Sequence, residues 1–310
     1  MKQRGAAVIM ALFIVVLCTL AISPLIWNLF ATAKTVSVSA ARDQTLEVTQ
    51  SAVDWARVIL REDARVSATD NLTEPWAVPL AESRLSEGLM RPNESSSNLT
   101  DKEAVVTGRI EDAQGRFNLR NLGLDNSNRA VWLLAFAKLC DLLGVSGAQQ
   151  KALVDTLGAM YPPAPASPPD KQVSQNQVRL LPAKRWQEFD NNDGVDENTW
   201  SQLRPYVVIL PDITPLNANT ASAELLYACI EKLGFPDAQQ VVARRERVPF
   251  KDLSDLRAAL NPDIEIQSSM LGVKSDYFLV EGSARIDEAL VRTQALLERK
   301  NQRVYVMWRQ

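Results

Sequence analysis

The longest apolar run lies at the N-terminus, and it predicts a helix that can cross a membrane. Between Ala6 and Ala33 there is no acidic or basic residue, and Lys2 and Arg4 are the only charged side chains before it. A bilayer-spanning helix needs about 20 apolar residues. Because a cationic end resists translocation, we expect the N-terminus to stay in the cytoplasm and the rest of the chain to be exported.

Three interpretations of this run are open on its residues alone. The first is a removable secretory signal, suggested by the small residues at 31–33, although such signals usually have an apolar core of about 7–15 residues. The second is a plain single-span anchor. The third is a prepilin-type signal, in which a peptidase cuts directly after Gly5 and leaves Ala6 as the mature N-terminus.

The helical pattern continues beyond the apolar run. Apolar residues recur at steps of three, four and seven, at Leu46, Val53, Ala56 and Leu60. No Gly or Pro lies between Pro24 and Pro75. We therefore predict one helix over residues 6–66, on the order of 90 Å long at 1.5 Å per residue, with a kink at Pro24 and a membrane part over about 6–33.

A polar, proline-containing stretch from Pro75 to Asn98 predicts a loop, with Trp76 as a core or docking aromatic. The next apolar positions alternate with polar ones, at Val106, Gly108 and Ile110, and this period of two predicts a strand. Asp112 to Gly115 is typical of a turn, after which Phe117 and Leu119 continue the alternation.

Helical signals dominate the middle of the chain. Residues 125–127 offer an N-cap for a helix over 129–143, and Gly144 offers its C-terminal stop. Because apolar residues surround this helix, we expect it to be buried on all sides. Ser146 and Gln149 form a capping box for a second helix that runs to Met160. The five prolines within 161–172 then predict an exposed loop.

A helix-hairpin-helix-like element follows. Thr220 is the predicted cap of a helix that ends at Gly234, with a hairpin at 235–236 and a second helix starting near Asp237. Another helix is expected from about Asp252. DNA-binding hairpins present backbone N–H groups to phosphates. Here the hairpin segment 233–237 has one Gly, a Pro and an acid, so we interpret it as a packing scaffold.

The C-terminal segment predicts two strands, over 276–287 and 302–309, joined by 288–301. Alternation at Phe278 and Val280, and again at Tyr305 and Met307, favours a half-buried antiparallel pair. Strands on either side of a helical block indicate an α+β fold in which an all-α domain is inserted into a sheet layer.

Composition narrows the function. The chain has no histidine, which removes Ser-His-Asp and Cys-His pairs and nearly all zinc sites. A net charge of −3 gives no basic face for nucleic acid, and the short basic run 244–247 is interpreted as a solvated helix end. Cys18 lies in the apolar span, whereas Cys140 and Cys229 are either bridged in an oxidising compartment or simply packed in the core.

One acidic stretch is a candidate calcium site. Asp190, Asp193, Asp196 and Glu197 gather oxygen ligands, but without the spacing of an EF-hand loop. The alternative is a solvated turn in which Asp196 caps the following helix.

Taken in order, these pieces resemble the minor pseudopilin K (GspK) family of type II secretion systems. The resemblance runs over nearly the whole chain, and it is carried by the leader that ends at Gly5 and by the segments 55–63, 74–77, 110–122, 210–226, 245–250 and 275–286. It implies that prepilin peptidase cuts between Gly5 and Ala6 and methylates Ala6. Pseudopilins usually have Glu at the fifth mature position, whereas this chain has Met10, as expected for the tip subunit of a pseudopilus.

The resemblance also implies partners and a location. The partners are the minor pseudopilins I and J, with pseudopilin H, the major pseudopilin G and the inner-membrane secretion platform as further candidates. The protein would be single-pass in the bacterial inner membrane, with a periplasmic C-terminal part and no nucleic-acid partner. One departure concerns calcium: of the family's acidic motif, the matching place 153–170 keeps only Asp155. We therefore assign no cofactor.

We predict a leader (1–5), the N-terminal helix (6–66), the first part of a pseudopilin-like α/β domain with an antiparallel sheet (67–121), an inserted α-domain (122–273) and C-terminal strands (274–310). The predicted function is structural and non-enzymatic: a minor pseudopilin that forms the pseudopilus tip and primes its assembly. The alternatives are a membrane-anchored periplasmic hydrolase that uses carboxylates and a membrane-tethered DNA-binding domain.

Overall fold

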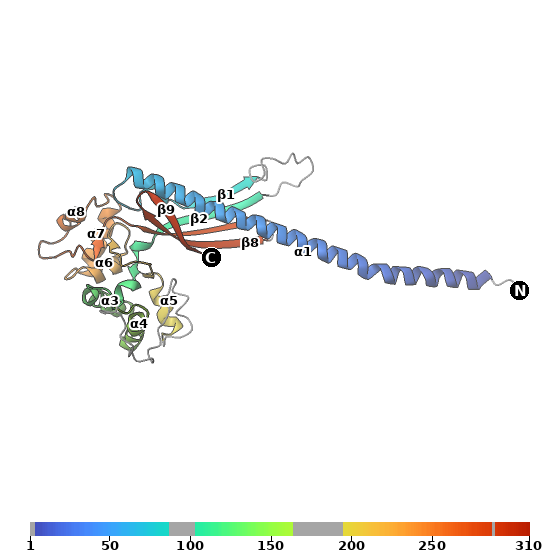
Figure 1. Cartoon of the computed structure of the whole chain (residues 1–310), viewed down its shortest axis with the longest axis horizontal. Helices are drawn as coiled ribbons and strands as arrows, with labels where there is room; N and C mark the ends of the chain where they lie inside the picture. Colours follow the sequence, from blue (N-terminus) through green and yellow to red (C-terminus); the bar gives the residue numbers. More distant parts are fainter. Residues whose placement is uncertain (1–3, 87–102, 164–194, 287–288) are drawn as a thin grey trace, which may run out of the picture. The chain divides into compact units, whose positions relative to one another are not determined.

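The N-terminal helix is continuous, as the sequence predicts. The computed structural model describes residues 4–86, 103–163, 195–286 and 289–310. Helix α1 (Arg4–Val66) is 63 residues long and contains Pro24 without ending there (Figure 1). It is long and apolar enough to cross a membrane. The predicted kink at Pro24 stays a prediction.

The chain divides into two compact units, each made of three segments. The first contains Met1–Ala52, Leu80–Gly108 and Gly282–Thr293, and the second contains Val53–Pro79, Arg109–Glu281 and Gln294–Gln310. The buried clusters described below lie within the second unit.

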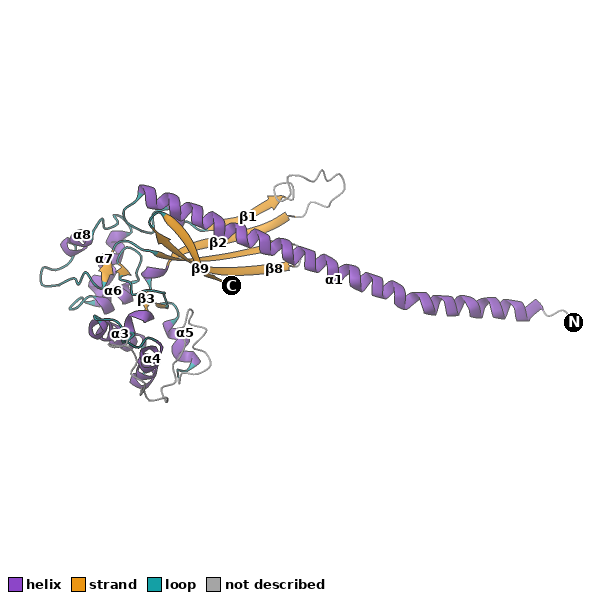
Figure 2. Cartoon of the chain, in the orientation of Figure 1, coloured by secondary structure: helices purple, strands orange, loops and turns teal. Residues whose placement is uncertain are grey.

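A five-stranded sheet, drawn in orange in Figure 2, has the strand order β1-β2-β7-β8-β9. Its strands are β1 (Leu80–Ser86), β2 (Glu103–Asp112), β7 (Tyr277–Ile286), β8 (Ala289–Lys300) and β9 (Arg303–Arg309). The pairs β1–β2 and β8–β9 are antiparallel. The prediction of an α+β fold with an antiparallel sheet and a long N-terminal helix is confirmed.

Two strands of this sheet occupy segments where the sequence predicts no strand. Strand β1 lies in the predicted loop, and β8 fills the predicted link 288–301, so the two predicted C-terminal strands flank β8 instead of pairing with each other. The pattern of β8 explains the error. Ala295 and Leu297 pack in one apolar cluster while Leu296 packs in another, so three consecutive residues are buried. A strand covered on both faces loses the period of two that marks a half-buried strand.

The middle of the chain is mainly helical. Its helices are α3 (Arg129–Leu143), α4 (Gly147–Met160), α5 (Glu197–Leu203), α6 (Ala223–Cys229), α7 (Phe235–Arg245) and α8 (Leu253–Ala258), with the 3₁₀ turns η1 (Pro75–Ala77), η2 (Ala113–Gly115) and η3 (Leu119–Leu122). Four two-residue strands form parallel pairs, β3 (Phe117–Asn118) with β4 (Val207–Val208) and β5 (Leu216–Asn217) with β6 (Leu271–Gly272). The block predicted as all-α therefore also contains short β-pairs.

Two of the predicted helix ends are confirmed, at Gly144 and Ser146. The Ser146 side chain accepts the N–H of Gln149 at the start of α4, and Gly144 ends α3 with φ 74°. The predicted cap at 125–127 is off by one, because Asn128 precedes α3. The predicted cap Thr220 is wrong: Ser222 caps α6, which ends at Cys229 rather than Gly234.

The helix-hairpin-helix boundary also differs from its prediction. Helix α7 already begins at Phe235 with Pro236 in its first turn, so 235–236 is not a hairpin. Proline suits the first helical turn because its missing N–H has no partner there.

Helix α3 is not buried on all sides. Phe136, Leu139 and Cys140 are buried in the main apolar cluster, but Leu134 is 73% exposed and Leu142 is also exposed. The expectation of burial around the whole circumference is therefore wrong. Helical positions five apart point in different directions, so Leu134 and Leu139 lie on different faces of α3.

The cysteines in this block are packed as thiols. Cys140 and Cys229 are both free and buried in the main cluster, and Cys18 is free and exposed on α1. The disulfide interpretation is not realised in the structure, which shows the core-packing alternative. Burial raises the pKa of each of the two buried thiols to about 12. The predicted loop beyond Pro163 lies outside the described residues.

Candidate functional site

A buried polar cluster, here called the polar junction, connects distant segments of the second unit. It consists of Asp70, Asp112, Asn217, Ser275 and Arg299, all of them buried. They come from the segment after α1, the end of β2, the short strand β5, the segment before β7, and β8. Buried polar groups are costly unless they find partners, so their hydrogen bonds decide whether the junction stabilises the fold.

Asp112 is a shared acceptor. Its Oδ2 accepts from Asn217 Nδ2 at 2.8 Å, from Thr220 Oγ1 at 2.5 Å and from Ser275 Oγ at 2.7 Å. Its Oδ1 accepts the backbone N–H of Gln114 at 2.8 Å. This use of Thr220 explains why Thr220 does not cap α6. One carboxylate thereby connects β2, the helical block and the start of β7.

Asp70 links the same segments to the end of α1. Its Oδ2 accepts the backbone N–H of Ser275 at 2.8 Å, and its carbonyl oxygen accepts from Asn217 Nδ2 at 3.0 Å. Its backbone N–H donates to the Val273 carbonyl at 2.9 Å.

Arg299 supplies the positive charge. Its Nη1 donates to Asp63 Oδ2 at 2.8 Å, and its Nη2 donates to Asp70 Oδ1 and to the Ser275 carbonyl. The guanidinium also lies over the Phe278 ring, 4.7 Å from its centroid. A planar fork of donors suits two carboxylates at once.

Glu74 accepts four hydrogen bonds beside the junction. The donors are the backbone N–H and Nδ2 of Asn71 at 3.1 and 3.0 Å, Trp76 Nε1 at 2.7 Å and Ser67 Oγ at 2.7 Å. Trp76 is 1% exposed and packs edge-on against Phe278. Its interpretation as a core aromatic is therefore confirmed.

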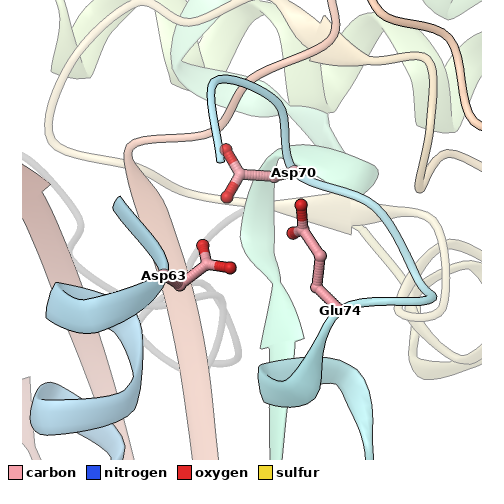
Figure 3. A group of neighbouring side chains, drawn as sticks. All are labelled: Asp63, Asp70 and Glu74. Atoms are coloured by element: carbon pink, nitrogen blue, oxygen red, sulfur yellow. The ribbon is translucent and has the colours of Figure 1, made fainter. Parts of the chain in front are cut away.

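Asp63, Asp70 and Glu74 raise the question of a metal ion. One carboxylate oxygen from each lies within 4.8 Å of the others, and Figure 3 shows the three side chains converging. Calcium takes six to eight oxygen ligands. Here the Arg299 guanidinium binds two of the carboxylates, and protein donors already occupy the third. The donor set therefore fits an internal ion-pair network rather than a cation site.

The candidate calcium stretch is described only in part. Asp196 Oδ1 accepts the N–H of Thr199 at 2.7 Å as the N-cap of α5, and Glu197 pairs with Arg204 at 2.8 Å. Both contacts fit the alternative of a capped helix start. Asp190 and Asp193 lie outside the described residues, so calcium at this stretch stays a prediction.

The junction's two acids, Asp70 and Asp112, and the neighbouring Asp63 all have raised pKa values. Burial raises the pKa of Asp63 to about 6, and the negative charge of Glu74 adds to the rise, whereas the Arg299 guanidinium opposes it. Burial also raises the pKa of Asp112 to about 6, although hydrogen bonds from Thr220 and Ser275 oppose the shift. Burial raises the pKa of Asp70 in the same direction.

These shifts predict that mild acid stabilises the part of the chain that follows the apolar run. The folded pKa values near 6 exceed the unfolded value of 3.8, so the folded state binds protons more tightly as the pH falls through 6. Between about pH 7 and pH 5 we expect the free energy of unfolding to rise by on the order of 1–2 kcal/mol. Urea denaturation at both pH values measures it. Asp63→Asn should reduce the rise, and a fall in stability toward pH 5 would contradict the prediction.

Three buried asparagines hold neighbouring loops through hydrogen bonds between their side-chain amides and the backbone. Asn121 exchanges hydrogen bonds with the backbone of Thr214, and Asn219 does the same with Phe250. Asn118 donates to the Asp212 carbonyl and accepts the N–H of Leu210. An amide side chain offers both donor and acceptor, so it can imitate a strand neighbour where no strand is present.

Sequence reasoning did not find the junction as a site. Several of its residues lie in the quoted segments 110–122, 210–226 and 275–286, but Asp70 and Arg299 lie in none of them. A usable signal was the density of Asn, Asp, Ser and Thr within 210–222, which interrupts an otherwise apolar region. No such signal marks Arg299, which resembles any charged residue near a strand end.

The predicted processing residues lie at the start of α1. Gly5 and Ala6 are helical, and the Met10 side chain is exposed on the helix. Later parts of the chain match models of a known protein family. Two family models, both described as "Type II secretion system (T2SS), protein K", match residues 115–212 and 216–274, which together make up just over half of the chain. This chain belongs to the type II secretion system protein K family.

Relatives from two bacteria support this assignment to the protein K family. The type II secretion system protein K of Pseudomonas aeruginosa is 26% identical over 268 residues, covering 82% of this chain and 75% of that protein. That of Pectobacterium carotovorum subsp. carotovorum is 24% identical over 332 residues, covering 100% of this chain and 96% of that protein.

A solved structure shares the fold. A chain in the crystal structure of the GspK-GspI-GspJ complex from the enterotoxigenic Escherichia coli type 2 secretion system matches with a TM-score of 0.63 and 19% identity. The match covers 89% of this chain and 98% of that chain. It confirms the protein K fold over most of the length.

Proposed function

We propose that this chain is the minor pseudopilin at the tip of a periplasmic pseudopilus, where it primes assembly and catalyses no reaction. The observation that carries the proposal is its membership of the protein K family together with an α1 helix whose membrane part has no acidic or basic residue. In other pseudopilins an acid near the mature N-terminus pairs with a neighbour's ammonium group. Met10 offers no such pair.

The partners follow from the same proposal. The solved relative with this fold comes from a complex with GspI and GspJ, which supports minor pseudopilins I and J as neighbours of this chain. Pseudopilin H, the major pseudopilin G and the inner-membrane platform are further proposed partners. The chain is proposed to be single-pass in the inner membrane, because one helix long and apolar enough to span a bilayer follows a basic N-terminal end.

The polar junction gives the proposal a physical basis. A subunit that closes a filament must present one rigid surface, and a helical block on a flexible link could not. Asp112 and Asp70 connect the helical block to β2, to the segment before β7 and to the end of α1 through buried hydrogen bonds. Fully satisfied buried networks are rigid. We therefore propose that the helical block acts as a fixed cap, which prevents a further subunit from stacking above it.

Processing provides a direct prediction. Mass spectrometry of the protein extracted from membranes should show a mature chain that begins at Ala6 and carries an N-methyl group. The physical reason is that cleavage on the cytoplasmic side of the apolar run leaves the membrane helix in place. A chain that begins at Lys34 would mean that ordinary signal peptidase removes the helix, and the pseudopilin proposal would fall.

The wild-type chain should co-purify from detergent with pseudopilins I and J.

The apolar residue at the fifth mature position, Met10, provides another prediction. Met10→Glu introduces a carboxylate without an ammonium above it, and an unpaired charge in a membrane helix costs about 2.5 kcal/mol or more on insertion scales. We expect less membrane-inserted protein and reduced secretion.

Met10→Leu is the matched control for this prediction, because it changes shape without charge and should behave as wild type. Incorporation of Met10→Glu subunits along the pseudopilus shaft, detected by immunogold labelling, would show that the tip assignment is wrong.

A further inference from the structure

The basic run 244–247 forms one side of a surface hollow of about 570 Å³ on the helical block. Its lining includes the cations Arg244, Arg247 and Lys251, the apolar residues Val248 and Phe250, and one acid, Asp255. The sequence interpretation of this run as a solvated helix end does not account for the hollow. We call it the basic hollow.

The three arginines of the run have different roles. Arg245 is 5% exposed, and its Nη1 donates to the Ala218 carbonyl at 2.5 Å, so it fastens α7 to the segment before α6. Arg244 and Arg247 are exposed instead, three positions apart on the same side of the chain. One arginine therefore serves the fold, and two are available to a ligand.

The helix dipole explains only part of this arrangement. Cations in the last turn of α7 are favoured by the partial negative charge of its C-terminus, which suits Arg244. Lys251 comes from the following segment, six residues beyond the end of α7. Its presence on the same hollow places three positive charges around one space.

These cations form no ion pair in the part of the chain that the structure describes, although the charge of Lys251 acts on the neighbouring carboxylate of Asp252. No carboxylate there lies within ion-pair distance of Arg244, Arg247 or Lys251. The lining acid Asp255 accepts the backbone N–H of Lys251 at 3.1 Å, so it holds the backbone of the hollow. The Arg244 guanidinium lies 6.0 Å from the centroid of the Phe250 ring, at the outer limit of a cation–π contact.

We propose that the basic hollow binds an extended acidic segment of a partner protein, with carboxylate side chains on Arg244, Arg247 and Lys251 and an apolar side chain on Val248. Val248 is 63% exposed at the hollow. Arginine binds carboxylates through two parallel hydrogen bonds, and a space of this size suits a few side chains. Nucleic acid is less suited, because its binding rests on a longer series of phosphate contacts and the chain is acidic as a whole.

Fluorescence anisotropy with the full-length chain in uncharged detergent tests the site. The probe is a fluorescein-labelled nonapeptide with four glutamates around a central leucine, and the control peptide has glutamine in place of glutamate. The glutamate peptide should bind at least roughly tenfold more tightly than the control, and its affinity should fall between about 50 and about 300 mM salt.

A pair of charge-reversed variants locates the binding. Arg244→Glu with Arg247→Glu should weaken the glutamate peptide at least roughly tenfold. Arg257→Glu with Arg303→Glu makes the same change of charge at exposed residues outside the hollow and should keep wild-type affinity. Lys251→Gln should lower the affinity for the glutamate peptide by less than the double variant does. Unchanged circular dichroism and thermal unfolding show that the variants are folded.

Three results would overturn the site: equal affinity for the two peptides, equal loss of affinity in the two double variants, or displacement of the peptide by a lower concentration of a short single-stranded oligonucleotide.

Failure of the basic hollow can be distinguished from failure of the proposed function. The Arg244→Glu, Arg247→Glu variant should still co-purify with pseudopilins I and J. Peptide binding by a chain that fails to co-purify would leave the basic hollow standing and remove the assembly proposal.

Discussion

Arg299→Met is expected to lower the free energy of unfolding of residues 34–310 by about 3–5 kcal/mol, because it leaves Asp63 and Asp70 as buried carboxylates without their cation. Most of this cost comes from the charges left behind rather than from the lost attraction. Urea denaturation of residues 34–310, followed by circular dichroism, measures this loss at pH 7.

Arg109→Met is the matched control for this prediction. Arg109 also pairs with carboxylates, those of Glu111 and Glu281, but its side chain is half exposed. Exposed pairs contribute about 0–1 kcal/mol, so this variant should remain close to wild type. Arg299→Lys should fall between the two, because an ammonium group keeps the charge but lacks the fork that reaches both acids. An Arg299→Met chain as stable as Arg109→Met would show that the junction does not stabilise the fold.

Leu139→Ala is expected to cost about 2–5 kcal/mol, since Leu139 is completely buried in the main apolar cluster and its truncation leaves a cavity. Leu134→Ala makes the same chemical change in the same helix, at a side chain that is 73% exposed. We expect it to change stability by less than about 0.5 kcal/mol. Thermal and urea unfolding of the two variants side by side measures the difference. Similar losses at both positions would contradict the orientation of α3.

The contrast at α3 shows where sequence reasoning ends. The pattern established a helix over 129–143 and its stop at Gly144, because propensity and a left-handed C-terminal glycine are local properties. Apolar residues around the whole circumference then predicted burial on all sides. Burial depends on which elements pack against each side, and that information is not local.

The sheet shows the same division. The period of two in β2 identified that strand, because one face is more buried than the other. Strand β8 escaped detection, since apolar clusters cover both of its faces at residues 295–297 and good helix formers fill much of its sequence. The residues of this segment alone allow either a helix or a strand, and the tertiary environment decided for the strand.

By itself, the sequence determined the elements whose causes are local: the continuous helix α1, the Ser146 cap and the strand β2. It also determined the family, through motifs distributed over the chain. Only the tertiary structure decided the polar junction, because Asp70, Asp112 and Arg299 are far apart in sequence and become partners when folding removes them from water. A buried charge must find a partner wherever the fold provides one, and neither spacing nor residue type indicates beforehand which partner that is.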